Sequence, residues 1–478
     1  MRRALTIGLG IAALVGLGCG DHGASPAAVD ALPGELLDAA LVTDGRLVAV
    51  GHELVDGSPR PLALALHGDG ALAWRTHLGG EGAVGQLDAV VVDEGGIVYV
   101  AGRLVTSDHP GGVGEVAALD EQGAVAWRTE PVAVGSSEVE ALAVVGDDLY
   151  VTGFAEIPDA DGNPQRGMLV ARLARATGAL EWSDVLEAHS DPLGFTTGVS
   201  LDVSELSYVG AAGFAAPGRG RTGWLVGMWS TAGERLWESL RSVDDALDLG
   251  WEGGDLNLAR AGRFDAHGRF LVVGDLFRAR DGSDRSLVSY AADTGAVAWE
   301  SLAGAALDAG EASFDEGTAL VTSGDDVWVA SSMAAREEGD VLAWEAAVTR
   351  YDGATGEQRW EAPFLGTSTS GERILDLGLD ADGNVYAAGF ASDAGGIGKH
   401  AAIEKLDGDG QLVWSAEVSL ATSDADDDYA AALAVAPDGA SWLIGRIDVH
   451  DGLEVPSVEH FGPDGTLRWS YPAGVRER

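Results

Sequence analysis

One motif, a glycine followed four residues later by a tryptophan, recurs eight times and constrains the fold more than any other feature. Eight of the 14 tryptophans occupy this position, at intervals of 53 to 62 residues. Self-similarity at such a period predicts one supersecondary unit that is repeated along the chain. The eight copies are Gly70-Ala-Leu-Ala-Trp74, Gly123-Ala-Val-Ala-Trp127, Gly178-Ala-Leu-Glu-Trp182, Gly233-Glu-Arg-Leu-Trp237, Gly295-Ala-Val-Ala-Trp299, Gly356-Glu-Gln-Arg-Trp360, Gly410-Gln-Leu-Val-Trp414 and Gly465-Thr-Leu-Arg-Trp469.

A second motif precedes each tryptophan and has the alternation of a β-strand that ends in glycine. Another apolar strand with an acidic or glycine-containing turn comes before it, and a third strand follows it. Such alternation with Asp-Gly turns is typical of β-hairpins. In the sixth copy, Val327-Trp-Val-Ala-Ser331, serine replaces the glycine. The other copies are Val48-Ala-Val-Gly51, Tyr99-Val-Ala-Gly102, Tyr150-Val-Thr-Gly153, Tyr208-Val-Gly210, Val272-Val-Gly274, Tyr386-Ala-Ala-Gly389 and Leu443-Ile-Gly445.

Each unit therefore contains four strands, and the eight units fill residues 35–478. A four-stranded sheet cannot bury both of its faces alone, whereas radial stacking of such sheets buries them and leaves only short edges. An open row of sheets would need polar caps, and neither terminal unit differs enough to be one. We predict an all-β fold, an eight-bladed β-propeller of four-stranded antiparallel blades. The eight repeated tryptophans are then structural and lie between blades.

The charge of the chain excludes several partners. It has 76 Asp and Glu against 30 Lys and Arg, a formal net charge of −46. Such a polyanion repels nucleic acids and anionic lipid headgroups, so we expect no nucleic-acid partner. With a single cysteine, Cys19, the chain forms no internal disulfide and no thiolate metal site. The ten histidines form no metal-ligand or nucleophile motif, so we predict no catalytic residues.

The N-terminus reads as a targeting segment. Arg2 and Arg3 precede an apolar stretch, Ala4–Gly18, that is too short to span a bilayer and ends at Cys19. This resembles the lipobox of bacterial lipoproteins, although Leu17 lies two residues before the cysteine where those boxes usually have leucine three before it. We predict a lipoprotein-type signal peptide over residues 1–18, lipidation of Cys19 and a short tether over 19–34. An ordinary signal peptide with an incidental cysteine is the alternative.

Several copies of the repeat resemble the quinoprotein-type (PQQ-like) propeller repeat: Asp293-Thr-Gly-Ala-Val-Ala-Trp299, Ala354-Thr-Gly-Glu-Gln-Arg-Trp360 and Ala176-Thr-Gly-Ala-Leu-Glu-Trp182. Leu379-Asp-Ala-Asp-Gly-Asn-Val-Tyr-Ala-Ala-Gly389 resembles the repeat of bacterial secreted propellers. The resemblance covers residues 35–478. It implies a propeller fold, and such families include an eight-bladed outer-membrane assembly lipoprotein as well as surface lipoproteins of unknown role.

The enzymes that this resemblance suggests are quinoprotein alcohol dehydrogenases. They carry a vicinal disulfide near the cofactor, which a chain with only Cys19 cannot form, and their calcium and catalytic carboxylates have no counterparts here. We therefore expect no PQQ and no other organic cofactor. Calcium binding stays open as an alternative. The sialidase Asp-box is also absent, because Asp293-x-Gly295 is followed by tryptophan one residue too late.

Acidic turns are the candidate cation sites. Asp159-Ala-Asp161-Gly-Asn163 and Asp380-Ala-Asp382-Gly-Asn384 offer hard oxygen ligands, but neither continues to the bidentate glutamate of a calcium loop. Tight turns need the same residues, so calcium and turn chemistry are both open there. In the third run, four carboxylates within five residues repel each other unless they are solvated or bind a cation. Its acidic residues are Asp424, Asp426, Asp427 and Asp428.

The connections between second and third strands vary most in length, as in Ala215–Thr222 and Arg278–Arg285. With the inter-blade crossings, which include Ser242–Leu256, they should form a loop-rich face that binds a protein or glycan partner. Neutral drift of surface loops explains the variation equally well. We predict a monomeric, non-enzymatic, lipid-anchored propeller outside the cytoplasm, at the outer membrane or cell surface. A quinoprotein-like oxidoreductase or hydrolase and a purely structural surface protein are the alternatives.

Overall fold

The computed structural model describes residues 33–477 except residues 81, 133–134, 160, 188–194, 219–220, 242–256, 279–281, 304–312, 337–341, 367–370, 393–397, 420–427, 449–453 and 473–475. Strands dominate this part of the chain, and the one helical element there is a 3-10 turn, η1 (Phe364–Gly366). None of the helical structure in these residues is long and apolar enough to cross a membrane. The predicted signal peptide, Cys19 and nearly all of the tether lie outside the described residues.

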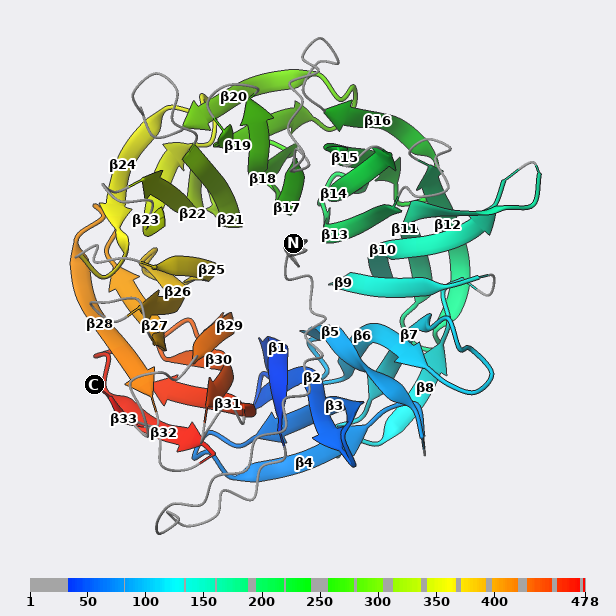
Figure 1. Cartoon of the computed structure of the whole chain (residues 1–478), viewed down its shortest axis with the longest axis horizontal. Helices are drawn as coiled ribbons and strands as arrows, with labels where there is room; N and C mark the ends of the chain where they lie inside the picture. Colours follow the sequence, from blue (N-terminus) through cyan, green and yellow to red (C-terminus); the bar gives the residue numbers. More distant parts are fainter. Residues whose placement is uncertain are drawn as a thin grey trace, which may run out of the picture. The chain divides into compact units, whose positions relative to one another are not determined.

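Eight four-stranded antiparallel blades form a ring with the first strand of each blade innermost (Figure 1), so the predicted eight-bladed β-propeller is confirmed. Each blade comes from one continuous stretch of chain. The strands of blades 1 to 4 are β1 (Gly34–Leu41), β2 (Leu47–Val55), β3 (Ser58–Leu66), β4 (Leu72–His77); β5 (Val84–Val92), β6 (Val98–Val105), β7 (Val113–Leu119), β8 (Val125–Thr129); β9 (Ser137–Val145), β10 (Asp148–Pro158), β11 (Pro164–Ala174), β12 (Ala179–Glu187); β13 (Phe195–Val203), β14 (Tyr208–Gly218), β15 (Arg221–Ser230) and β16 (Arg235–Arg241).

Blades 5 and 6 are joined by a short parallel pairing of β19 with β21, and blade 7 gains a fifth strand, β33. The strands of blades 5 to 8 are β17 (Leu258–Phe264), β18 (Arg269–Arg278), β19 (Gly282–Ala291), β20 (Val297–Ala303); β21 (Ser313–Ser323), β22 (Asp326–Arg336), β23 (Leu342–Asp352), β24 (Gln358–Pro363); β25 (Arg373–Leu379), β26 (Val385–Ser392), β27 (Lys399–Leu406), β28 (Leu412–Ser419), with β33 (Arg476–Glu477); and β29 (Tyr429–Val435), β30 (Ser441–Asp448), β31 (Glu454–Phe461) and β32 (Leu467–Tyr471).

In the part of the chain that the structure describes, the ring closes by packing of side chains and not by a shared strand. β1 packs against β29, β30 and β31, so blade 1 meets blade 8 as any two successive blades meet. Leu36 and Leu64 of blade 1 share one buried cluster with Trp442 and Ile444 of blade 8. Closure of the propeller therefore depends on apolar burial at this seam.

The glycine of the second-strand motif faces a β-bulge in the first strand. In blade 1, Gly51 is opposite Leu36, where the register shifts, and an added Cβ would lie 2.0 Å from the carbonyl oxygen of Glu35. A side chain cannot fit there, because the bulge brings the two backbones together. In blade 4 the residue in this role is Gly213, so the sequence-based choice of Gly210 was wrong by three residues.

Several second and third strands are longer than the sequence predicted. β14 continues to Gly218 and β15 begins at Arg221, so most of the expected connection Ala215–Thr222 is strand. Likewise β19 begins at Gly282, inside the expected connection Arg278–Arg285. The polar and glycine residues there had suggested loops, but the two strands pair as far as Gly218 with Arg221 and Arg278 with Gly282, and this pairing overrides the local preference.

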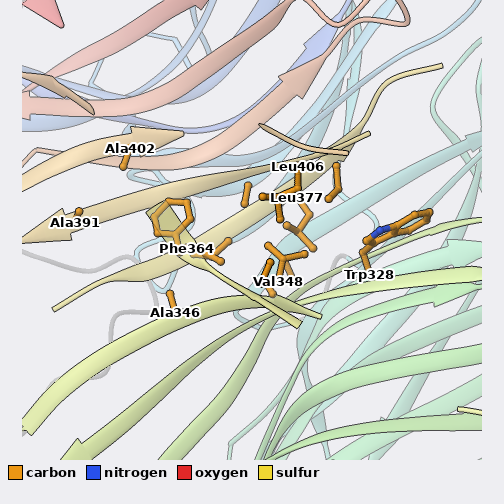
Figure 2. Packing of buried hydrophobic residues seen from close by; sticks show 14 residues of the cluster. Trp328, Ala346, Val348, Phe364, Leu377, Ala391, Ala402 and Leu406 are labelled. Atoms are coloured by element: carbon orange, nitrogen blue, oxygen red, sulfur yellow. The ribbon is translucent and has the colours of Figure 1, made fainter. Parts of the chain in front are cut away.

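The core lies between successive blades. Figure 2 shows the cluster between blades 6 and 7, in which Trp328 and Val348 of blade 6 pack with Leu377 and Leu406 of blade 7. Phe364 of η1, which is fully buried, closes this cluster. Alternate residues of the second and third strands face the two neighbouring blades, which is why these strands are nearly continuous apolar runs in the sequence.

Candidate functional site

Each motif tryptophan packs on the motif glycine of the following blade. An added Cβ on Gly410 would lie 2.7 Å from Cδ2 of Trp360, and Gly410 has a φ of 78°. The indole N–H of Trp360 donates to the carbonyl of Gly408 at 3.0 Å. One Gly-x-x-x-Trp motif thus contributes to two interfaces, although the tryptophans are half-buried and not core residues. The pairs are Trp74–Gly123, Trp127–Gly178, Trp182–Gly233, Trp237–Gly295, Trp299–Gly356, Trp360–Gly410, Trp414–Gly465 and Trp469–Gly70.

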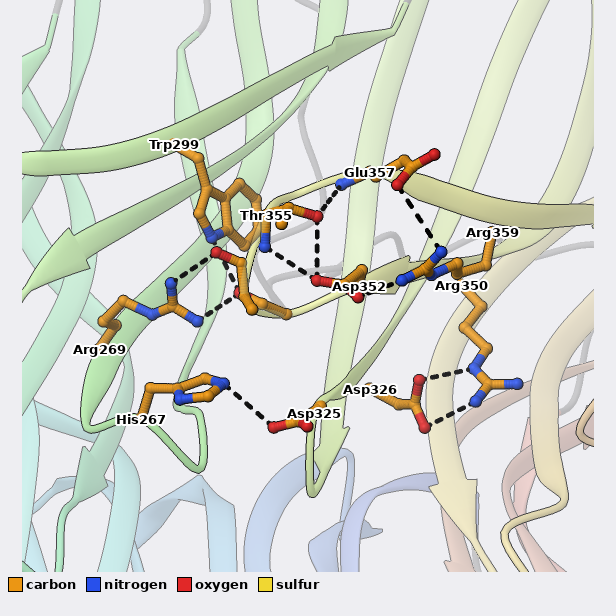
Figure 3. Close-up of polar contacts among 12 residues, drawn as sticks. His267, Arg269, Trp299, Asp325, Asp326, Arg350, Asp352, Thr355, Glu357 and Arg359 are labelled. Atoms are coloured by element: carbon orange, nitrogen blue, oxygen red, sulfur yellow. Dashed lines mark hydrogen bonds and ion pairs between the residues drawn. The ribbon is translucent and has the colours of Figure 1, made fainter.

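Charged side chains link the short hairpin turns of neighbouring blades, as Figure 3 shows for blades 5 and 6. Arg269 of blade 5 pairs with Asp265 in its own turn at 2.7 Å and donates to the carbonyls of Gly353 and Ala354 in blade 6, the latter at 3.0 Å. His267 contacts Asp325 of blade 6 at 3.0 Å. These contacts hold the turns of blades 5 and 6 together.

Carboxylates also cap the inner edges of the first strands. Asp38 Oδ2 accepts the N–H of Val90 in blade 2 at 2.8 Å, and Asp376 Oδ2 accepts the N–H of Leu433 in blade 8 at 2.9 Å. Burial raises the pKa of Asp38 to about 7 and that of Asp376 to about 6, while the backbone donors lower both. These side chains satisfy amides that no strand pairs with on the inner side of the ring.

Three carboxylates gather on the first strands of blades 2 and 3. Asp88, Glu138 and Glu140 each place one oxygen within 4.8 Å of the others. Asp88 and Glu140 are the extra residues of the β-bulges in β5 and β9, so the same backbone irregularity aims both side chains. Gln86 donates to Asp88 Oδ1 at 2.5 Å.

Burial of this cluster changes its protonation. Burial and the neighbouring Glu138 raise the pKa of Asp88 to about 8, and burial with Asp88 and Glu138 raises the pKa of Glu140 well above its ordinary value. Burial also raises the pKa of Glu138, while Arg103 lowers it. Like charges this close do not all ionise together, so the cluster shares protons at neutral pH.

Carboxylates are hard ligands for a divalent cation, and they are poor partners for an anionic cofactor. PQQ is a tricarboxylate that needs positively charged partners, and the carboxyl groups on the innermost strands, Asp38, Asp88, Glu138, Glu140 and Asp376, supply no positive charge whether they are protonated or ionised. The residues present therefore do not fit PQQ.

The sequence analysis missed the cluster of Asp88, Glu138 and Glu140. Glu138-Val-Glu140 alternates as a strand with one solvated face would, and nothing local indicates a bulge. The one feature of the sequence that could have indicated the cluster is an acidic residue directly before an apolar run in the first strand of a repeat, as in Asp88-Ala-Val-Val-Val92.

The acidic turn of blade 3 uses its first carboxylate to close the turn. Asp159 Oδ1 accepts the backbone N–H of Asp161 and of Asn163, each at 2.8 Å. The hydrogen bonds from Asn163 lower the pKa of Asp159. Asp161 is exposed. This is the bonding of an Asx-type turn, one of the two expected interpretations.

The turn of blade 7 closes in the same way. Asp380 Oδ1 accepts the N–H of Asp382 at 3.0 Å and of Asn384 at 2.9 Å, and Lys405 Nζ lies 3.0 Å from Asp380 Oδ2. Burial raises the pKa of Asp380, but the hydrogen bonds from Asn384 and Lys405 outweigh burial and lower it. The ammonium group thus occupies the side of Asp380 that a cation would use.

Of the third acidic run the structure describes Asp428, which is fully buried. Its Oδ1 accepts the N–H of Asp448 at 2.7 Å, so this carboxylate joins the start of β29 to the end of β30. Asp424, Asp426 and Asp427 lie outside the described residues.

The fold and the repeat define the class of protein, a β-propeller with PQQ-like repeats. Residues 62–257 match the family described as the outer membrane protein assembly factor BamB. A search of curated protein sequences gave no significant match.

Solved structures show the same fold at low sequence identity. The quinohemoprotein alcohol dehydrogenase of Comamonas testosteroni superimposes with a TM-score of 0.53 at 11% identity, covering 92% of this chain and 76% of that one. Sqt1 of Chaetomium thermophilum superimposes with a TM-score of 0.51 at 10% identity, covering 87% and 94%. At this sequence identity the two likenesses define architecture alone.

Proposed function

We propose that this chain is a non-enzymatic, lipid-anchored propeller that serves as an interaction scaffold at the outer membrane or cell surface. The observation that carries the proposal is the match of residues 62–257 to an outer membrane assembly factor family. The apolar N-terminal stretch that ends at Cys19 supports the location. Each motif tryptophan packs on the motif glycine of the next blade, and charged side chains join neighbouring turns. The eight blades therefore form a rigid frame that carries the longer connections.

The anchor is tested by replacing the single cysteine. Cys19→Ser should release the protein from sedimented membranes, and the N-terminal peptide of the wild type should carry acyl chains in mass spectrometry. Gly20→Ser, next to the same cleavage position, is the matched control and should stay membrane-bound. Membrane association of the Cys19 variant equal to that of the wild type would contradict lipid anchoring.

The binding face is tested by placing a photo-reactive amino acid at exposed positions of the two faces. Asp108 lies in the connection between β6 and β7, and Asp325 lies in a short turn on the opposite face. We expect a discrete crosslinked partner in intact cells from position 108 and none from position 325. A glycan partner would give a crosslink that glycosidases remove. Equal labelling from both positions, or none from either, would refute binding at the loop-rich face.

The quinoprotein-like alternative is tested on the purified protein. We expect that PQQ with calcium leaves the melting temperature unchanged and supports no dye-linked alcohol oxidation, because the inner carboxyl groups offer an anionic cofactor no positive charge. A cofactor-dependent rise in melting temperature together with dye reduction would favour the enzyme.

A further inference from the structure

The outer edge of blade 7 pairs with the end of the chain. β33 runs antiparallel to β28, with Glu477 opposite Val418 and Arg476 opposite Ser419. Figure 1 shows β33 outside β28, next to the C-terminus, on the outer rim of the ring. The chain leaves blade 8 at Tyr471 and returns to the preceding blade. Of the outermost strands that the structure describes, only β28 has a strand on its outer side.

Most of this edge stays open. β28 spans Leu412–Ser419, and β33 pairs with the last two residues, so the six residues 412–417 have no described partner on the outer side. Six extended residues span about 20 Å. Leu412 is 47% exposed and Val413 is 53% exposed. Backbone groups without a partner beside exposed apolar side chains form a template for strand addition.

Three other blades protect the same position. The residue immediately before the motif tryptophan is charged in blades 3, 6 and 8, where it is Glu181, Arg359 and Arg468. It is alanine in blades 1, 2 and 5, and in blade 4 it is Leu236, which is less exposed than Val413 and has no described strand on its outer side. A charged side chain on an edge strand discourages pairing with another chain, whereas Val413 does not. The edge of blade 7 therefore combines a large exposed apolar side chain at this position with a demonstrated capacity to accept a strand.

We propose that β28 binds an extended segment of a partner protein by β-strand addition, and that Arg476–Glu477 cover the end of this edge until the partner displaces them. Two paired residues form few hydrogen bonds, each of which contributes about 1 kcal/mol net. A strand that pairs along all eight residues of β28 outcompetes them. The partner segment is apolar where it passes Leu412 and Val413, and it is basic elsewhere because the chain carries a net charge of −46.

The test uses the whole mature protein and a fluorescein-labelled peptide, Lys-Val-Thr-Val-Lys-Val-Thr-Arg. A second peptide with methyl groups on alternate backbone nitrogens has the same side chains but cannot donate those hydrogen bonds. The double variant Arg476→Pro with Glu477→Pro removes the N–H groups of β33 and frees the edge. Val413→Lys blocks the edge, and Leu180→Lys on β12, where Leu180 is 47% exposed, is its matched control.

We expect the double proline variant to bind the peptide at least tenfold more tightly than the wild type. Val413→Lys in that background should weaken binding at least tenfold, and Leu180→Lys should leave it unchanged. Hydrogen exchange should slow at residues 412–417 when the peptide binds, and the methylated peptide should not bind. Equal affinity for both peptides, equal loss in both lysine variants, or self-association of the freed edge in place of peptide binding would overturn the proposal. None of these outcomes depends on the anchor at Cys19 or on the loop-rich face.

Discussion

Glu404 should make the propeller less stable as the pH rises from 5 to 8. Its side chain is fully buried in β27 between blades 6 and 7. Oε2 accepts the N–H of Leu365 at 2.8 Å, whereas Oε1 has no partner among the described residues. Burial raises the pKa of Glu404 from 4.5 to about 8, the Leu365 amide lowers it, and the neighbouring Glu372 raises it. The folded protein therefore keeps the proton that the unfolded chain loses.

The magnitude follows from proton linkage. Below pH 4.5 both states hold the proton, and above the folded pKa of about 8 neither does. Between these values the unfolded chain binds fewer protons, so the free energy of unfolding falls by about 1.4 kcal/mol per pH unit. Over the three units from pH 5 to pH 8 the loss is about 4 kcal/mol, a large share of the stability of a domain.

Glu404→Gln removes this titration. The amide group leaves some buried polar atoms without partners at a cost of about 1–3 kcal/mol, but this cost does not depend on pH. The measurement is urea unfolding, followed by tryptophan fluorescence, at pH 5, 6, 7 and 8. The free energy of unfolding of the variant relative to the wild type should increase by about 4 kcal/mol across this range. Glu94→Gln, at an exposed position, is the control. Its free energy of unfolding should change with pH in the same way as that of the wild type. If the free energy of unfolding of Glu404→Gln differs from that of the wild type by the same amount at every pH from 5 to 8, the conclusion that Glu404 is protonated in the folded protein is wrong.

Two further predictions concern the interfaces. Gly410→Ala should cost about 2–4 kcal/mol in urea unfolding, because it adds a clash with Trp360 to the strain of a positive φ, whereas Gly45→Ala, which has a φ of 86° and no atom within 4 Å of an added Cβ, should cost about 1 kcal/mol. Equal costs would show that the tryptophan does not press on its glycine. Ser331→Gly should cost about 1–3 kcal/mol, because Ser331 Oγ accepts the buried Arg285 guanidinium at 2.8 Å. No change in stability there would mean that Thr349 and Glu361 alone satisfy Arg285.

The sequence predicted the ring because the signal repeats. A single glycine four residues before a tryptophan is weak evidence for any fold. Eight copies at a near-constant period indicate a repeated unit that buries its faces against neighbouring copies of the same unit. The tight turns were also readable, since Asp380-Ala-Asp-Gly-Asn384 closes as its residues prescribe. The substitution of Ser331 was visible as an exception to the motif, although its cause, Arg285 from the neighbouring blade, was not.

The candidate carboxylate cluster could not be predicted because contacts across blades decide it. Asp88 and Glu140 are 52 residues apart and meet only because both are bulge residues of adjacent first strands. Nothing in either local sequence distinguishes a bulge from a regular strand. The pairing of β33 with β28 was missed for a related reason, since two residues carry no periodicity.

Ring closure without a shared strand makes the interfaces between blades decisive for the whole molecule. The same position of the third strand, which faces the preceding blade, is Leu64, Ala117 and Ala171 in blades 1 to 3, but Thr349, Glu404 and Glu459 in blades 6 to 8; all six are fully buried.

Burial raises the pKa of Glu459 well above its ordinary value, as it does for Glu404, so both acids oppose ionisation within adjacent interfaces. At alkaline pH the third strands of blades 7 and 8, which carry these acids, should loosen before the third strands of blades 1 to 3, where the same position is apolar; the cluster of Asp88, Glu138 and Glu140 lies on first strands instead. Blade 8 also forms the seam with blade 1, where side-chain packing and not a common sheet holds the ring. Opening of the ring under such conditions should therefore begin on this side, and hydrogen exchange at pH 9 should be faster in β27 and β31 than in β3 and β7.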